Sequence, residues 1–231
     1  MGKALAQAED VSLQAGEATL QAAVTVPDEA EGLVIFVHGS GSSRFSPRNR
    51  AVAAHLNEGA LGTLLLDLLT MDEHRADEHT GHLRFNIPFL AARVEGAIDW
   101  AGRHDRTGGL KIGLFGASTG AAAALVAAAE RPDTVHAVVS RGGRPDLAPH
   151  ALPRVKAPVL LIVGGDDSPV IEMNRLAAQH ITAEHRLEIV PGATHLFEEP
   201  GTLEAVAELA TAWFLEHLAA ARRPLAGTTG T

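Results

Sequence analysis

Short runs of leucine and β-branched residues alternate along the chain with segments long enough to form helices. This alternation is typical of a mostly parallel sheet covered by helices on both faces. A further segment, 18–26, mixes polar and apolar residues and favours an antiparallel hairpin arm at the edge of the sheet. The runs that we expect to form buried strands are 33–37, 63–66, 110–115, 135–139, 159–163 and 187–190.

Three segments have the composition or spacing of helices. Apolar residues recur at 90, 94, 97, 98 and 101, and again at 203, 206, 207, 210 and 214, so each segment has one apolar helical face. Seven alanines in 121–129 predict a central helix that packs closely against the sheet. By contrast, 72–82 is charged and lacks apolar periodicity, so the sequence predicts a long loop there.

Length and composition limit the class of protein. The 231 residues contain no repeat or linker, so we expect one domain over 1–231, with 224–231 as a flexible tail. A formal charge of −9 and 4% aromatic residues argue against nucleic acid as a partner. We find neither a signal peptide nor about 18 consecutive apolar residues, which predicts a cytoplasmic protein with no membrane partner. A homodimer is left open.

The absence of cysteine restricts the chemistry that the chain can perform. With no Cys in the sequence, a disulfide framework, a thiolate metal site and a cysteine nucleophile are all excluded. Any covalent catalysis must therefore use another nucleophile.

The strongest motif is G-x-S-x-G at 116–120, directly after the strand 110–115 and before the alanine-rich helix. In this context the motif indicates a strained strand-to-helix turn that exposes the hydroxyl of Ser118. The helix dipole favours negative charge that develops there during a reaction. Ser118 is thus the candidate nucleophile.

A serine nucleophile needs a base and an acid that orients the base. Asp166 and Asp167 follow the strand 159–163, and His195 follows the strand 187–190. The carboxyl ends of parallel strands meet at one edge of a sheet, which would bring these groups to Ser118. Spacing alone leaves Asp166 and Asp167 equal as the acid.

Position also selects among the 12 histidines. His180 falls at the end of a predicted helix and His185 at the start of a strand, on the wrong edge of the sheet. Asp67 closes a strand on the active edge, but it precedes the nucleophile. The expected order along the chain is nucleophile, acid and then base, so Asp67 does not fit as the acid. His195 therefore remains as the candidate base.

Two backbone amides are candidates for an oxyanion hole. One belongs to Thr119, the residue after the nucleophile, and the other comes from the small-residue loop 38–43 after the strand 33–37. We favour Ser40 as this second donor, with Gly41 as the alternative.

From about Val34 to His195 the chain resembles the α/β-hydrolase superfamily, and it is most similar to small dienelactone-hydrolase-like proteins. The resemblance is carried by H-G-S-G-S-S at 38–43, G-A-S-T-G at 116–120, G-G-D-D-S-P-V at 164–170 and G-A-T-H at 192–195. It implies an α/β-hydrolase fold, and the superfamily pattern G-x-x-D-x-x-V assigns the acid to Asp167. Dienelactone hydrolases proper use a cysteine nucleophile, so Ser118 argues against dienelactone itself as substrate. The short gap between 139 and 159 predicts that no large cap domain is inserted.

Two other interpretations are weaker. The glycines from Gly113 to Gly120 do not form G-x-G-x-x-G, and no acid closes the next strand, which argues against a dinucleotide site. His74, Glu78 and His82 have the spacing of metal ligands on a helix, but Gly81 and the density of charge favour a solvated loop. We therefore expect neither a cofactor nor a metal.

Arginines gather near the predicted site of this acidic chain. Arg44, Arg48 and Arg50 follow the oxyanion loop, and Arg141 and Arg144 follow the strand 135–139. They could bind a carboxylate or phosphate of the substrate. Ion pairs with the acidic segment 72–78 are the interpretation that we favour from the sequence.

The sequence thus predicts a serine hydrolase of the carboxylesterase type that cleaves small esters or lactones through an acyl-enzyme. Ser118, His195 and Asp167 would form the triad, and the amides of Thr119 and Ser40 would bind the oxyanion. Activity should fall on acidification, because a protonated His195 cannot act as a base. The alternatives are cofactor-free perhydrolase or haloperoxidase chemistry, or a binding protein that has lost catalysis.

Overall fold

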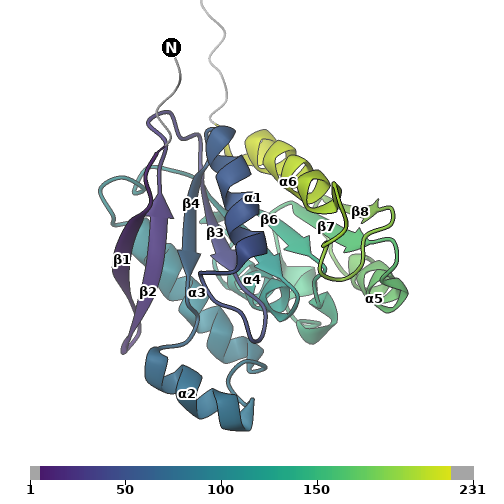
Figure 1. The fold of residues 1–231 in the computed structure, drawn as a ribbon, viewed down its shortest axis with the longest axis horizontal. Helices are drawn as coiled ribbons and strands as arrows, with labels where there is room; N and C mark the ends of the chain where they lie inside the picture. The colour runs from purple at the N-terminus through teal and green to yellow at the C-terminus, as the bar shows by residue number, and fades with distance from the viewer. Residues whose placement is uncertain (1–5, 220–231) are drawn as a thin grey trace, which may run out of the picture.

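Eight strands form one mixed sheet, and helices cover both of its faces (Figure 1). The computed structural model describes residues 6–219. The strands lie in the order β1-β2-β4-β3-β5-β6-β7-β8. Their bounds are β1 Glu9–Ala15, β2 Ala18–Thr25, β3 Leu33–Val37, β4 Gly62–Leu66, β5 Ile112–Ala117, β6 Val135–Arg141, β7 Val159–Gly164 and β8 His185–Val190. The helices are α1 Pro47–Glu58, α2 Met71–Thr80, α3 Ile87–Ala101, α4 Thr119–Glu130, α5 Ser168–Ala178 and α6 Thr202–Leu218.

The hydrophobic runs determine which strands are central. Every residue of β3, β4, β5 and β7 is buried, whereas the edge strand β1 is mostly exposed. β1 and β2 form an antiparallel hairpin, β2 pairs antiparallel with β4, and the remaining pairs are parallel. The predicted α/β fold with a mostly parallel sheet is therefore confirmed. The segment 18–26 forms an arm of an antiparallel hairpin as expected, but β1 and not β2 is the edge strand.

Two large apolar cores and one small cluster lie between the sheet and its helices. One core lies under α3 and α4, and the other lies under α1 and α6, where the rings of Phe36 and Phe115 are 4.8 Å apart. The residues 121–124 of α4 are all alanines with no exposed surface. Their small side chains let α4 approach the sheet closely, and this brings the first turn of the helix up to the end of β5.

The segment 72–82 forms a helix for most of its length, so the expectation of a long loop is wrong. Thr70 and Glu73 form a capping box at the start of α2, where the Thr70 amide donates to Glu73 over 2.8 Å and the Glu73 amide to Thr70 over 3.2 Å. Gly81 has φ 63°, the left-handed conformation that ends helices. The helix lies beyond the carboxyl end of β4 (Figure 1).

The connection from β6 to β7 contains only two 3-10 turns, Pro145–Leu147 and Leu152–Arg154. The prediction that no large cap is inserted here is confirmed. The loops that follow the strands form the surface at the carboxyl edge of the sheet. Among the helices of residues 6–219, none is long and apolar enough to cross a membrane. The predicted tail at 224–231 lies outside the described residues.

Candidate active site

Ser118 occupies a strained turn between β5 and α4. Its backbone has φ 50° and ψ −124°, a conformation that residues with a side chain rarely adopt. The flanking glycines are required by close backbone contacts. A Cβ at Gly120 would lie 2.2 Å from the carbonyl oxygen of Val37, and one at Gly116 would lie 2.4 Å from the Cα of Ala121. The motif thus has the geometry expected of a nucleophile turn.

Neighbouring backbone groups hold Ser118 in this conformation. Its amide donates to the carbonyl of Arg141 over 3.2 Å, and its own carbonyl accepts from the amides of Ala121 and Arg144, both over 3.1 Å. A Cβ at Gly39 would lie 3.1 Å from the Cβ of Ser118, so the oxyanion loop also passes close to the nucleophile. The strain at Ser118 is therefore balanced by contacts from α4, β6 and the oxyanion loop.

His195 and Asp167 are brought together at the ends of β8 and β7. Nδ1 of His195 lies 2.7 Å from Oδ2 of Asp167. The loops that carry them touch, because the amide of Asp166 donates to the carbonyl of Ala193 over 2.9 Å. The side chain of Asp166 is exposed, whereas that of Asp167 is only 14% exposed. Geometry thus separates the two aspartates that sequence spacing left equal.

Ser118 and His195 line one polar cavity of about 270 Å³, together with Arg48, Asn49 and Arg141. Within residues 6–219 no hydrogen bond joins the Ser118 hydroxyl to the imidazole. Such bonds often tighten only when a substrate binds. The shared cavity therefore places both groups where one substrate could reach them.

The two candidate oxyanion donors differ in whether their amides already have a hydrogen-bond partner. The amide of Thr119 stands in the first turn of α4 and has no hydrogen-bond partner in the described part of the chain. The amide of Ser40 donates to the hydroxyl oxygen of Thr119 over 2.9 Å. Ser40 could therefore donate to an oxyanion only if it shared this bond or released it.

His38 fixes the base of the oxyanion loop. Its Nε2 accepts from the amide of Leu68 over 3.1 Å, so the proton resides on Nδ1, which lies 2.9 Å from the carbonyl oxygen of Gly39. Burial, as the largest effect, lowers the pKa of His38 from its ordinary 6.5. The neutral ring therefore ties the loop after β3 to the segment after β4.

A second cavity of about 240 Å³ is also lined by the oxyanion loop. Its apolar lining includes Leu68, Leu69 and Leu90, and it shares Gly39 and Ser40 with the polar cavity. The oxyanion loop thus borders both the polar cavity that contains the nucleophile and an apolar cavity lined in part by α2.

Comparison with known proteins identifies the family. A model of the dienelactone hydrolase family matches residues 72–221, which is more than half of the chain. The chain belongs to the dienelactone hydrolase family. The crystal structure of a dienelactone hydrolase from Anabaena variabilis is 58% identical, with a TM-score of 0.91 over 93% of this chain and 99% of that one. The resemblance inferred from the motifs is therefore confirmed.

More distant structures share the fold alone. Est1E from Butyrivibrio proteoclasticus is 19% identical, with a TM-score of 0.75 over 90% of this chain and 98% of its own.

Curated relatives from two strains of Mycobacterium tuberculosis are 52% identical over 210 residues and are provisionally named phosphoribosyl transferases. The match covers 91% of this chain but 46% of each relative, so the chain spans about half their length.

Most arginines near the site of this dienelactone hydrolase family member have carboxylate partners, but not those expected. Arg44 pairs with Asp67, Arg48 with Glu198 over 2.9 Å, and Arg144 with Asp146 over 2.8 Å. The expectation that these arginines pair with the segment 72–78 is wrong, since α2 directs its acids elsewhere. Within that segment, Asp72 pairs with Arg75, Glu73 with Arg93 and Asp77 with Arg84.

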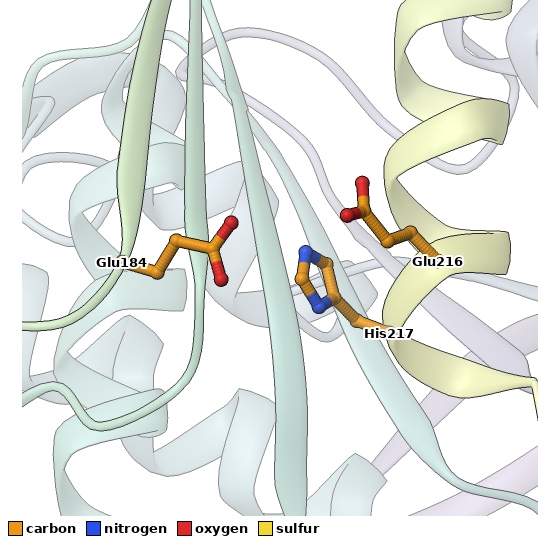
Figure 2. A group of neighbouring side chains, drawn as sticks. All are labelled: Glu184, Glu216 and His217. Carbon is orange, nitrogen blue, oxygen red and sulfur yellow. The ribbon is translucent and has the colours of Figure 1, made fainter. Parts of the chain in front are cut away.

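Metal-ligating side chains meet in one place in residues 6–219, far from Ser118 in the sheet. Glu184, Glu216 and His217 offer ligand atoms within 4.8 Å of one another (Figure 2). They lie at the amino end of β8 and on the last turns of α6, the edge of the sheet opposite the nucleophile. Arg186 already lies 3.5 Å from Glu184 and 3.6 Å from Glu216, so a cation accompanies these acids.

The histidines and acids of 72–82 form no such group. His74 and Glu78 lie 3.5 Å apart on α2 as an i,i+4 pair. His82 follows Gly81, which ends the helix, so it leaves the face that the spacing had suggested.

Sequence reasoning missed several groups that lie near the base or line its cavity. Thr194 donates to Glu199 from its amide over 3.1 Å and from its hydroxyl over 2.6 Å. Gly142 lies against His195, since a Cβ there would be 3.5 Å from the imidazole. Asn49 is 3% exposed and lines the polar cavity. Thr194 stands in the segment G-A-T-H, but its bonds to Glu199, like the positions of Gly142 and Asn49, are seen only in the folded chain.

Proposed function

We propose that this chain is a serine hydrolase that cleaves carboxylic esters or lactones through an acyl-enzyme. The observation that carries the proposal is the strained conformation of Ser118 in the cavity that also contains His195, whose Nδ1 lies 2.7 Å from Asp167. A serine hydroxyl, an imidazole and a carboxylate in this relation are the groups that acyl transfer needs.

In the first half-reaction His195 accepts the proton of the Ser118 hydroxyl as its oxygen attacks the ester carbonyl. The amide of Thr119, with that of Ser40, would donate to the oxygen that gains negative charge. His195 then gives its proton to the leaving alcohol, and an ester of Ser118 remains. Asp167 orients the imidazole throughout and stabilises its charged form.

In the second half-reaction water attacks the acyl group and gives a proton to His195. The carboxylic acid then leaves, and the proton returns to Ser118. If hydrogen peroxide took the place of water, the same acyl-enzyme would release a peracid, and peracid formation is therefore the alternative activity. The apolar cavity beside α2 would suit an apolar part of a small substrate.

The reactivity of Ser118 tests this proposal directly. A fluorophosphonate should label the parent protein at Ser118, as read by peptide mass mapping, because the phosphorus takes the place of the acyl carbon. Ser118→Ala should take up no label, whereas Ser168→Ala, which alters an exposed serine at the start of α5, should be labelled like the parent. Absence of label in the folded parent protein, or equal label in Ser118→Ala, would refute the proposal.

A second assay distinguishes hydrolysis from peracid formation. The parent protein would be given one aryl acetate, with and without hydrogen peroxide, and acetic and peracetic acid would be quantified. Hydrolysis as the dominant reaction supports the esterase assignment, and dominant peracid formation replaces it with the alternative. Absence of both products across a panel of acyl chains would indicate a binding protein with this fold.

A further inference from the structure

Arg141 is a buried cation without a carboxylate partner. Its residue surface is 7% exposed, and within residues 6–219 neither its Nε nor its Nη1 has a hydrogen-bond partner. The ring of Phe197, whose centroid lies 5.8 Å from the guanidinium carbon, gives it partial compensation. Arg44 and Arg144, by contrast, each pair with an aspartate.

A second arginine adds to the positive charge at this point. Arg48 lines the same cavity as Arg141. Its Nη1 pairs with Glu198, which does not line the cavity, and its Nε has no partner in the described part of the chain. Burial, followed by the charge of Arg48, lowers the pKa of Arg141 to about 10, so Arg141 remains cationic at neutral pH. No acidic side chain is among the described residues that line the cavity.

Such an arrangement is costly in the free protein. A buried charge without a partner destabilises the folded state, and two neighbouring cations repel each other. A bound anion would remove both penalties and would occupy the unused N–H donors. The cost is therefore consistent with a site that is completed by a ligand.

The position of Arg141 ties this site to the proposed nucleophile. Arg141 is the last residue of β6, its backbone pairs with Ala117 in the sheet, and its carbonyl accepts from the amide of Ser118. An anion at its guanidinium would thus lie in the cavity where the ester bond is attacked.

We propose that Arg141 and Arg48 form a subsite for a phosphate group that the ester substrate carries. This inference rests on the serine hydrolase function proposed above and narrows its substrate class. A phosphate is favoured over a carboxylate because it offers three oxygens to the separate unused donors of the two guanidinium groups. The phosphate stays intact, and only the carboxylic ester is cleaved.

Matched substrates test the subsite by kinetics. Phenyl acetate, 4-acetoxybenzoate and 4-acetoxyphenyl phosphate share one acyl group and differ in the charge of the leaving phenol. In the parent protein the ratio of kcat/KM for the phosphate ester to that for phenyl acetate should exceed the ratio for the benzoate. Arg141→Gln should reduce the phosphate ratio on the order of 10- to 100-fold.

The control removes the same charge nearby. Arg144→Gln, in which the lost arginine was paired with Asp146, should keep the parent ratio. If Arg141→Gln does not fold, Arg48→Gln provides the same comparison from a partly exposed position and should also lower the ratio. A ratio unchanged in both variants, or a larger ratio for the benzoate in the parent, would overturn the proposal.

A binding measurement separates this proposal from the function on which it rests. In Ser118→Ala, which cannot form an acyl-enzyme, calorimetry should detect binding of inorganic phosphate and of 4-acetoxyphenyl phosphate, and Arg141→Gln should abolish both. Binding without turnover in the parent would count against the esterase function alone. Ester turnover with no phosphate binding, or with binding that survives Arg141→Gln, would overturn the subsite alone.

Discussion

Thr194, the residue before the proposed base His195, donates two hydrogen bonds to the carboxylate of Glu199. The two residues close the short loop after β8 and fix the backbone from which the imidazole projects. In the proposed reaction Glu199 would therefore be a positioning residue, which acts only through the placement of His195.

We expect Glu199→Gln to lower kcat by about tenfold with little change in KM, because small displacements of a catalytic group reduce rate steeply. Glu208→Gln, a change of the same charge at an exposed position on α6, should keep the parent kcat. Steady-state kinetics with one aryl acetate measures both. A parent-like kcat in Glu199→Gln would show that the loop holds His195 without this carboxylate.

The same carboxylate should give a pH-dependent stability. The hydrogen bonds from Thr194 lower the pKa of Glu199 from its ordinary 4.5, so the folded state favours the ionised form. The contribution of ionised Glu199 to the free energy of unfolding is complete above about pH 4.5 and is lost as pH falls through the lowered pKa. The difference in Tm between the parent and Glu199→Gln should therefore narrow below about pH 4.5. A constant difference down to acid unfolding would contradict this account.

His38 should also make the protein less stable as pH falls, although its neutral form, and not a charged form, is the one that the folded state favours. Its folded pKa is lowered, so the unfolded chain binds a proton first and stability falls as pH drops below about 6.5. We expect His38→Leu to lose about 1–3 kcal/mol of unfolding free energy at alkaline pH, because Leu68 and Gly39 lose their partner. The loss, measured by urea unfolding, should be smaller at about pH 5.5. His180→Leu, at an exposed position, serves as the control and should match the parent at both values.

Asp77 should be the acid of α2 that matters for stability. It is 1% exposed, lies 2.6 Å from Arg84 and accepts from the amide of Leu83 over 2.6 Å. Burial alone would raise its pKa, but these partners lower it overall. Asp77→Asn should cost about 3 kcal/mol, because Arg84 loses its counter-charge.

The matched control lies one and a half turns earlier on the same helix. Asp72 is exposed and pairs with Arg75 over 3.5 Å, so Asp72→Asn should cost less than about 0.5 kcal/mol in the same urea unfolding assay. Equal losses in the two variants would contradict the assignment of Asp77 as a buried structural ion pair.

The sequence predicts best those features that local pattern determines. Strand β7 is an uninterrupted apolar run, and the structure buries it completely. Ser118, Asp167 and His195 each follow the end of a strand, and the carboxyl ends of parallel strands meet at one edge of the sheet. The sequence could therefore predict that they lie at the same edge. Strand β1 was missed because its exposed edge position leaves no continuous apolar run.

Helix α2 was missed for a reason that can be named. Gly81 counted against a helix, yet it is the residue that ends one. The capping signal Thr70-x-x-Glu73 begins two residues before the charged segment. Hydrophobic period alone cannot detect a helix whose only buried side chain is Asp77. The pattern of caps was the available signal.

The partners of the arginines could not be predicted, because each depends on which loops meet in space. Arg48 on α1 pairs with Glu198, 150 residues later, and Arg141 faces the proposed active site with no carboxylate partner within residues 6–219. The engagement of the Ser40 amide by Thr119 is equally non-local, since 79 residues separate them. Such contacts come only from the folded chain.

Turnover by Ser118→Ala tests the central claim most directly. With a small aryl acetate as substrate, kcat of this variant and of the parent would be measured side by side, with folding checked by circular dichroism. If Ser118 is the nucleophile, kcat should fall on the order of a million-fold, to the background of the assay. A folded Ser118→Ala variant that retains kcat within about tenfold of the parent would contradict the account, because losing a nucleophile costs far more than that.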